Sequence, residues 1–175
     1  VVAEPRPEIV YPGGKIIYLT FDDGPNSTVT PKVLDALKRN NVKATFFIIN
    51  YPDSRKDIVK RIVDEGHTLA IHTYNHDYSV CYASDAAYMQ GLKNMHDKIL
   101  ADTGYDAKSI RFPGGTSNAV SKNYNRGIMT RLSKKVTESG YIYFDWNVDS
   151  GDASGNRVSA TRIKNNVLRQ AKNKN

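Results

Sequence analysis

The sequence predicts an α/β fold in which a parallel sheet or barrel is covered by helices. Short apolar runs alternate five times with segments whose apolar residues recur at helical spacing, which is the pattern of repeated strand–helix units. Polar motifs follow four of these apolar runs directly. In parallel folds of this kind the functional site lies where the carboxyl ends of the strands meet. We therefore expect one domain with its site on that rim.

Five short apolar runs are expected to form the strands. They are residues 15–21, 43–49, 68–71, 109–112 and 141–146. Residues 1–14 precede them as an N-terminal extension, so the folded domain is expected to comprise residues 15–175.

A helix is expected after each strand. Thr30 suits the N-cap of the first helix and Pro31 its first position. Gly66 is expected to end the second helix, and Ser84 to cap the third. The expected helices are residues 31–40, residues 56–65, a segment from Ser84 with core residues Tyr88, Leu92, Met95 and Ile99, and two segments around residues 128–136 and 163–171.

Composition narrows the class of protein. The apolar share is 39%, which is typical of a globular chain, and no segment approaches the roughly 20 apolar residues of a membrane span. The net charge of +7 favours an anionic partner: the cell wall, a membrane surface or nucleic acid. The basic residues are spread along the chain without a nucleic-acid motif, so we expect no nucleic-acid partner. A single cysteine, Cys81, excludes an intramolecular disulfide and is expected to be inert.

Two adjacent acids, Asp22 and Asp23, end the first apolar run. Neighbouring carboxylates repel each other, and a bound cation is the simplest way to keep both ionised. Consecutive strand residues point to opposite faces, so both acids can face one site only if the strand breaks there. Gly24 and Pro25 are expected to supply that break.

A pair of histidines, His72 and His76, follows the third strand with four-residue spacing. This spacing puts both rings on one side of a helical turn or a tight loop. A catalytic zinc-type site uses three protein ligands and an open position, so one carboxylate and two histidines suffice. The alternative is two polar residues with ordinary hydrogen-bond partners. His67 precedes an expected strand and His96 lies on an expected helix, so both are expected to be structural or solvated.

Two further motifs end strands. Arg111 could pair with a catalytic carboxylate and hold it ionised, while the N–H of Gly114 could face an oxyanion. An ordinary turn after the strand explains the same residues. Around Trp146, the only tryptophan, lie three acids, of which one could orient a partner and the others cap turns: Asp145, Asp149 and Asp152.

Together these motifs resemble the polysaccharide deacetylases of carbohydrate esterase family 4, and look most like bacterial peptidoglycan N-acetylglucosamine deacetylases. The first four motifs of that family are matched in order by residues 20–25, 72–76, 111–113 and 149–152. The resemblance covers residue 15 to the end of the chain. It implies a distorted (β/α) barrel of about seven strands.

The resemblance also implies roles for these residues. Asp22 is the catalytic base, which Arg111 tunes. Asp23, His72 and His76 bind a divalent metal ion. Zinc is the default metal, although this ligand set also accepts cobalt or nickel.

By the same resemblance, the Gly114 N–H helps to hold the oxyanion, and Pro113, Gly114 and Trp146 contact the substrate. The family has an aromatic residue in place of Gly114 and a tryptophan in place of Ala153, so two walls of the substrate groove are missing. Trp146 and nearby tyrosines are candidates to replace them. Further candidates to line the groove are Tyr74, Asn75, Tyr78 and Tyr82.

The fifth motif of the family, a late strand with a histidine that protonates the leaving amine, has no counterpart, because no histidine follows His96. Asp152, expected as a catalytic residue that orients this histidine, lacks its partner. A general acid contributes about 10²–10⁴-fold, so we expect this chain by itself to be weak or inactive as a catalyst. We expect a catalytic domain truncated before its C-terminal strand or strands, which a C-terminal fragment or a second chain completes.

The expected function is removal of N-acetyl groups from N-acetylglucosamine units of bacterial peptidoglycan or chitooligosaccharide. The expected reaction is metal-dependent hydrolysis, and the expected location is extracellular or at the cell surface, in the bacterial cell wall. Two alternatives remain: an acetylxylan-type O-deacetylase, and a carbohydrate-binding relative that kept the metal site but lost turnover.

Overall fold

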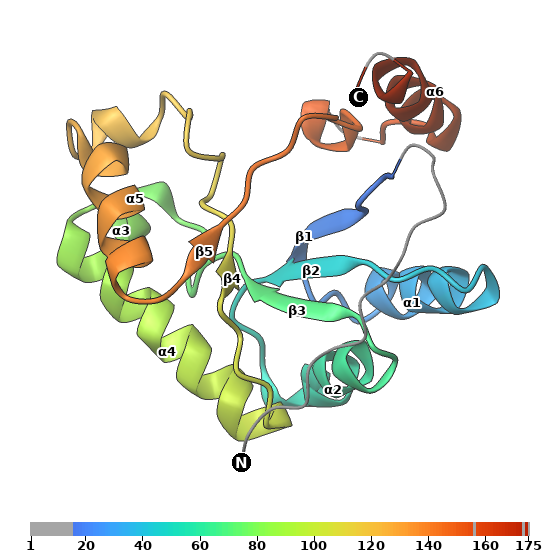
Figure 1. The fold of residues 1–175 in the computed structure, drawn as a ribbon, viewed down its shortest axis with the longest axis horizontal. Helices are drawn as coiled ribbons and strands as arrows, with labels where there is room; N and C mark the ends of the chain where they lie inside the picture. Colours follow the sequence, from blue (N-terminus) through green and yellow to red (C-terminus); the bar gives the residue numbers. More distant parts are fainter. Residues whose placement is uncertain (1–15, 156, 173, 175) are drawn as a thin grey trace. The chain divides into compact units, whose positions relative to one another are not determined.

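The computed structural model describes residues 16–155, 157–172 and 174 (Figure 1). It divides into two compact units. The larger unit is Leu19–Asn147, and the smaller one contains the described residues before Leu19 and after Asn147.

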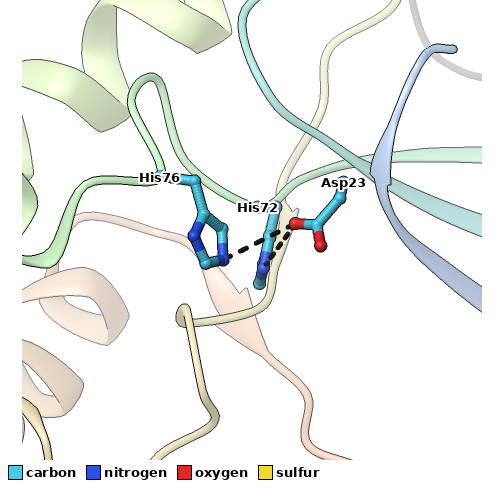
Figure 2. Close-up of side chains that lie close together, drawn as sticks. All are labelled: Asp23, His72 and His76. Atoms are coloured by element: carbon cyan, nitrogen blue, oxygen red, sulfur yellow. Dashed lines mark ion pairs between the residues drawn. The ribbon is translucent and has the colours of Figure 1, made fainter. Parts of the chain in front are cut away.

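The larger unit is built on a five-stranded parallel sheet whose strands lie side by side in chain order. The strands are β1 (Thr20–Gly24), β2 (Thr45–Ile48), β3 (Thr68–Ile71), β4 (Ser109–Ile110) and β5 (Ile142–Tyr143). The predicted α/β class and the five strand–helix alternations are confirmed. The carboxyl ends of β1 and β3 carry Asp23 and His72, as Figure 2 shows. Closure into a barrel of about seven strands stays a prediction.

Several strands are shorter than expected. The first strand was expected over 15–21, but pairing with β2 starts at Thr20 and continues to Gly24, while Lys15 lies outside the described residues. β5 comprises two residues of the expected 141–146, because β4 offers two residues for it to pair with. Apolar character marked where the strands lie, but the register of pairing sets where they begin and end.

Helices connect the strands of the larger unit. They are α1 (Val29–Arg39), α2 (Lys56–Asp64), α3 (Tyr78–Cys81), α4 (Asp85–Thr103) and α5 (Ile128–Glu138), with short 3₁₀ turns at Asp53–Arg55 and Ser121–Asn123. α1 begins two residues before the expected Pro31. The side chain of Asn26 accepts hydrogen bonds from the N–H groups of Thr28 and Val29, which satisfies the first amides of an earlier helix start.

Thr30, the expected N-cap, lies inside α1, so that prediction is wrong. The predicted cap at Ser84 is confirmed, because its hydroxyl accepts a hydrogen bond from the N–H of Ala87 at 3.0 Å. The buried face of α4 is also as predicted from its spacing: Tyr88, Leu92, Met95 and Ile99. α5 buries Ile128, Leu132 and Val136 in the same core. No helix in the described part of the chain is long and apolar enough to cross a membrane.

The smaller unit contains α6 (Ala160–Ala171) and a 3₁₀ turn at Asp152–Ser154. Its loop is attached to α6 by side-chain amides. The amide nitrogen of Asn166 donates to the carbonyl of Ser150 at 3.0 Å, and the N–H of Asp149 donates to the side-chain oxygen of Gln170 at 3.0 Å. These contacts give the turn a fixed position on α6 within this unit.

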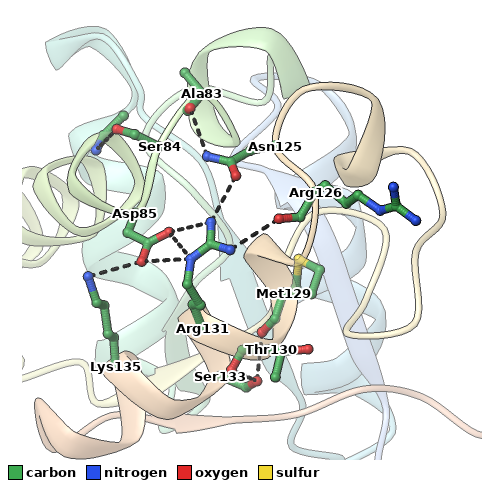
Figure 3. Close-up of polar contacts among 11 residues, drawn as sticks. Ala83, Ser84, Asp85, Asn125, Arg126, Met129, Thr130, Arg131, Ser133 and Lys135 are labelled. Carbon is green, nitrogen blue, oxygen red and sulfur yellow. Dashed lines mark hydrogen bonds and ion pairs between the residues drawn. The ribbon is translucent and has the colours of Figure 1, made fainter.

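A carboxylate at the start of α4 holds α5 in place (Figure 3). Asp85 lies 3.0 Å from Nη2 of Arg131 and 3.0 Å from Nζ of Lys135, both on α5. Arg131 also donates to the side-chain oxygen of Asn125, whose own amide donates to the carbonyl of Ala83. The Asp85 side chain is 15% exposed. The ammonium of Lys135, and with it Arg131, lowers the pKa of the Asp85 carboxyl.

The Asp85 cluster predicts a pH-dependent contribution to stability. Because its folded-state pKa is depressed, ionised Asp85 stabilises the fold above the usual carboxyl pKa of about 4, and this stabilisation disappears as the pH falls through the folded-state pKa. We expect Asp85→Asn to lower the midpoint of urea unfolding at pH 7, and this deficit to be smaller near pH 3. The exposed Asp64→Asn is the matched control, expected to change neither midpoint. A deficit of equal size at both pH values would contradict this account.

Candidate metal and catalytic site

The paired acids lie at an irregularity in β1. Asp22 pairs with Phe47 and Gly24 with Ile48, so Asp23 is an extra residue in the ladder. Its φ is +66°, in the left-handed region. β1 ends at Gly24, where the break was predicted, and its ladder is already irregular one residue earlier, at Asp23. A bulge of this kind redirects a side chain, which lets both consecutive acids serve one side of the sheet.

Three candidate ligands converge at this point (Figure 2). Oδ1 of Asp23 lies 3.4 Å from Nε2 of His72 and 3.5 Å from Nε2 of His76. These distances exceed ordinary hydrogen bonds. Ligand atoms about 2.0–2.2 Å from a tetrahedral zinc ion are roughly 3.3–3.6 Å apart. The donor set and its spacing therefore fit a divalent metal ion, and it is the one such cluster among the described residues.

The tautomer of His72 is fixed by the backbone. Its Nδ1 lies 2.8 Å from the carbonyl oxygen of Arg111. A carbonyl only accepts hydrogen bonds, so Nδ1 carries the proton and Nε2 presents its lone pair toward Asp23. The side chain is 3% exposed, and burial lowers the pKa of His72, which favours the neutral ring that a metal requires.

His76 lies in the loop between β3 and α3. The hydroxyl of Thr73 donates to the carbonyl of Asn75, and the side chain of Asn75 accepts from the N–H of Asp77. These bonds fold the loop so that the two histidine rings lie 5.0 Å apart. Of the two geometries open to the four-residue spacing, the chain adopts the tight loop.

Arg111 connects the acids to the rest of the site. Its Nη1 donates to Oδ1 of Asp22 at 2.7 Å and to the hydroxyl of Thr20 at 2.9 Å. Its guanidinium lies 4.1 Å from the centre of the Phe47 ring. The predicted pairing with a carboxylate is present, and the side chain is 3% exposed. Thr20, which sequence reasoning did not single out, shares the same guanidinium nitrogen with Asp22.

The chain after β5 also meets Arg111. Nε and Nη2 of Arg111 donate to the carbonyls of Phe144 and Asp145, each at 3.2 Å. The Trp146 ring lies 5.5 Å from the guanidinium carbon and is 45% exposed. The carboxylate of Asp145 accepts hydrogen bonds from the N–H and hydroxyl of Thr116. Asp145 therefore anchors the loop after β4, a long-range contact without a local signal in the sequence.

Pro113 and Gly114 differ in exposure. Pro113 is buried, and its carbonyl accepts a hydrogen bond from the Tyr82 hydroxyl at 2.8 Å. Gly114 is exposed with φ +76°. Its N–H makes no hydrogen bond to any residue that the structure describes. The N–H of Gly114 is thus a free hydrogen-bond donor on the rim of the site. Buried Pro113, the preceding residue, supports it.

The remaining candidates make none of the contacts described above. Asp152 belongs to the smaller unit, where its carboxylate accepts a hydrogen bond from the Ser150 hydroxyl at 2.5 Å. Its catalytic role stays a prediction. His67 is buried and accepts the N–H of Ala44 at Nδ1, while His96 pairs with Asp106 at 2.7 Å. Burial raises the pKa of the Cys81 thiol to about 12, so this cysteine is inert as expected.

Curated proteins of known name are similar to this chain. A peptidoglycan-N-acetylglucosamine deacetylase of Bacillus cereus is 38% identical over 153 residues, covering 87% of this chain and 50% of that protein. A chitooligosaccharide deacetylase of Bradyrhizobium is 35% identical over 159 residues, covering 89% and 66%. The chain thus spans about half to two thirds of the length of these curated relatives.

A solved structure and a family profile also match this chain to deacetylases. The catalytic domain of peptidoglycan N-acetylglucosamine deacetylase from Eubacterium rectale matches with a TM-score of 0.89 and 47% identity, covering 95% of this chain and 75% of that one. The sequence profile of the polysaccharide deacetylases matches residues 10–130. This chain is therefore a member of the polysaccharide deacetylase family.

Proposed function

We propose that this chain is the catalytic part of a metal-dependent deacetylase that removes N-acetyl groups from N-acetylglucosamine units of peptidoglycan or chitooligosaccharide. One observation carries the proposal: a three-ligand metal set lies directly beside a carboxylate held by a buried arginine. The ligands are Asp23, His72 and His76, and the held carboxylate is Asp22. A hydrolase needs both parts, whereas a binding protein needs no held base.

The proposed mechanism divides the work among these residues. Asp23, His72 and His76 would hold a divalent ion, which would supply Lewis-acid chemistry: it would polarise an acyl carbonyl and lower the pKa of bound water. Asp22 takes the proton of the attacking water, and Arg111 keeps that carboxylate oriented through the 2.7 Å contact. The free N–H of Gly114 donates to the oxygen on which negative charge develops. Zinc suits this ligand set, and cobalt or nickel fit it too.

The proposed substrate rests on the relatives and on charge. Their names include peptidoglycan and chitooligosaccharide deacetylases. The net charge of +7 suits an anionic wall polymer, so we place the protein's action at the bacterial cell wall, outside the cell. Exposed Trp146 is proposed as a wall of the sugar groove, and exposed Gly114 as a further contact with the substrate. Pro113 is buried, so its proposed contact with the substrate is made through its backbone.

Protonation of the leaving amine is a separate requirement. The chain has four histidines. Two are the proposed ligands, His67 is buried, and His96 pairs with Asp106. We propose that a general acid comes from a segment outside this chain, with Asp152 to orient it and with strands that complete the barrel. Added imidazole is a suitable substitute in assays of the present chain.

Removing one ligand is expected to remove the metal. His76→Ala leaves two donors, so the zinc content of the purified protein should fall from about one ion per chain to nearly none. His96→Ala is the matched control and should keep its zinc. Metal analysis by mass spectrometry measures both. Full zinc content in His76→Ala would contradict the assigned ligand set.

Removing the base is expected to separate activity from metal binding. Asp22→Asn keeps the shape of the side chain, so zinc should stay bound, while acetate release from chitotetraose with added imidazole should fall by about 10²–10⁴-fold. Acetylated xylan, tested in parallel, reports on the alternative O-deacetylase. A wild-type chain that binds zinc and chitotetraose but releases no acetate from either polymer would refute the proposed reaction.

Arg111→Lys tests the role of the guanidinium. Lysine keeps the charge but loses the planar set of donors that reaches Thr20 and Asp22 together. We expect acetate release to fall by roughly 100-fold, because Asp22 is displaced from its working position. Zinc should remain, because the backbone carbonyl at this position, which orients His72, is unchanged. Simultaneous loss of zinc would argue that the side chain also shapes the metal site.

A further inference from the structure

Tyr78 has a hydroxyl without a partner at the edge of the metal site. It is the first residue of α3, directly after the loop that carries His76. Its ring packs edge-on against His76, with centroids 5.6 Å apart. The side chain is partly buried, yet the hydroxyl makes no hydrogen bond to any other described residue. A free donor is therefore held next to a candidate metal ligand.

The same hydroxyl lies against Gly114. A Cβ atom placed on Gly114 would be 2.7 Å from the Tyr78 oxygen and 3.0 Å from Cβ of Asn118. Cβ atoms do not approach other atoms so closely, so any larger residue at Gly114 would displace Tyr78. The space that a side chain at this position would fill is occupied by the hydroxyl of Tyr78. Two free donors, this hydroxyl and the Gly114 N–H, thus border one point of the rim.

Tyr82, one turn further along, shows what a structural tyrosine does here. Its side chain is fully buried, and its hydroxyl donates to the carbonyl of Pro113 at 2.8 Å. The Tyr82 hydroxyl therefore already has a hydrogen-bond partner inside the protein. Tyr78 packs 5.5 Å from Tyr82, centroid to centroid, which fixes the ring, and its hydroxyl lies against exposed Gly114. Tyr82 is therefore a structural residue, whereas the hydroxyl of Tyr78 is free to donate a hydrogen bond to a ligand.

We propose that the hydroxyl of Tyr78 donates a hydrogen bond to the acyl oxygen of the bound N-acetyl group, as a second donor beside the Gly114 N–H. The inference rests on the proposed deacetylase function. Donors aimed at an oxygen that gains negative charge act mainly in the transition state. Tyr78 is thus a substrate-contacting residue, chosen among the aromatic candidates by its free hydroxyl and its position between His76 and Gly114.

Tyr78→Phe, which removes one oxygen atom and keeps the ring, tests this proposal. With chitotetraose and imidazole, kcat should fall by about 100-fold while KM changes little. Zinc content and melting temperature should stay at wild-type values. The matched control is Tyr141→Phe: Tyr141 also lacks a hydrogen-bond partner among the described residues, but it precedes β5 and lies at the amino edge of the sheet. It should behave as wild type.

A binding measurement removes the dependence on turnover. Acetohydroxamate offers zinc an acyl oxygen, and its affinity for the zinc-loaded protein can be measured by calorimetry. We expect Tyr78→Phe to weaken this affinity by about tenfold, the effect of one hydrogen bond to a charged oxygen. Tyr141→Phe should leave it unchanged.

The outcomes separate the inference from the proposed function. Wild-type affinity for acetohydroxamate and wild-type kcat in Tyr78→Phe would overturn the role of Tyr78 alone. A raised KM with unchanged kcat would also overturn it, because the hydroxyl would then contact the sugar and not the reacting oxygen. Loss of zinc in the variant would make Tyr78 a support of the metal site instead. A wild-type chain that binds neither zinc nor acetohydroxamate would overturn both proposals.

Discussion

The buried guanidinium of Arg111 is the contact on which the site depends. It follows β4, yet it reaches Thr20 and Asp22 on β1 and the carbonyls after β5. In a flat sheet β1 would lie about 14 Å from β4, three strand spacings away. One side chain spans this separation only because the sheet curls. Curvature and ion pairing therefore depend on each other: the curl brings the acid to the arginine, and the buried charge requires its partner.

The same residue couples the two chemical parts of the site. Its side chain holds Asp22, the proposed base, while its carbonyl fixes the ring of His72, a proposed ligand. A shift of β4 would displace both groups together. The proposed base and the proposed ligand are thus both positioned by Arg111. Their geometry relative to each other therefore stays constant when other parts of the rim move.

Local patterns predicted the parts of this site that lie within single motifs. The paired acids, the two histidines and Arg111 each stand at a strand end, where residue type and spacing are sufficient evidence. Contacts between distant segments were not predictable in this way. The shared donation of Arg111 to Thr20, the anchoring of Thr116 by Asp145 and the place of Tyr78 beside Gly114 all depend on how the strands are brought together. The location of the bulge in β1 likewise depends on its pairing with β2.

The left-handed backbone of Asp23 limits how this protein can be redesigned or can diverge. At φ +66°, glycine, asparagine and aspartate are tolerated, while other side chains carry steric strain. Among these three, only aspartate supplies an anionic ligand. Exchanging this carboxylate for cysteine or histidine, the usual way to favour a softer metal, would therefore meet a backbone obstacle. His76, the proposed ligand in a loop without this constraint, is therefore the position at which a substitution can change the metal preference of the proposed site.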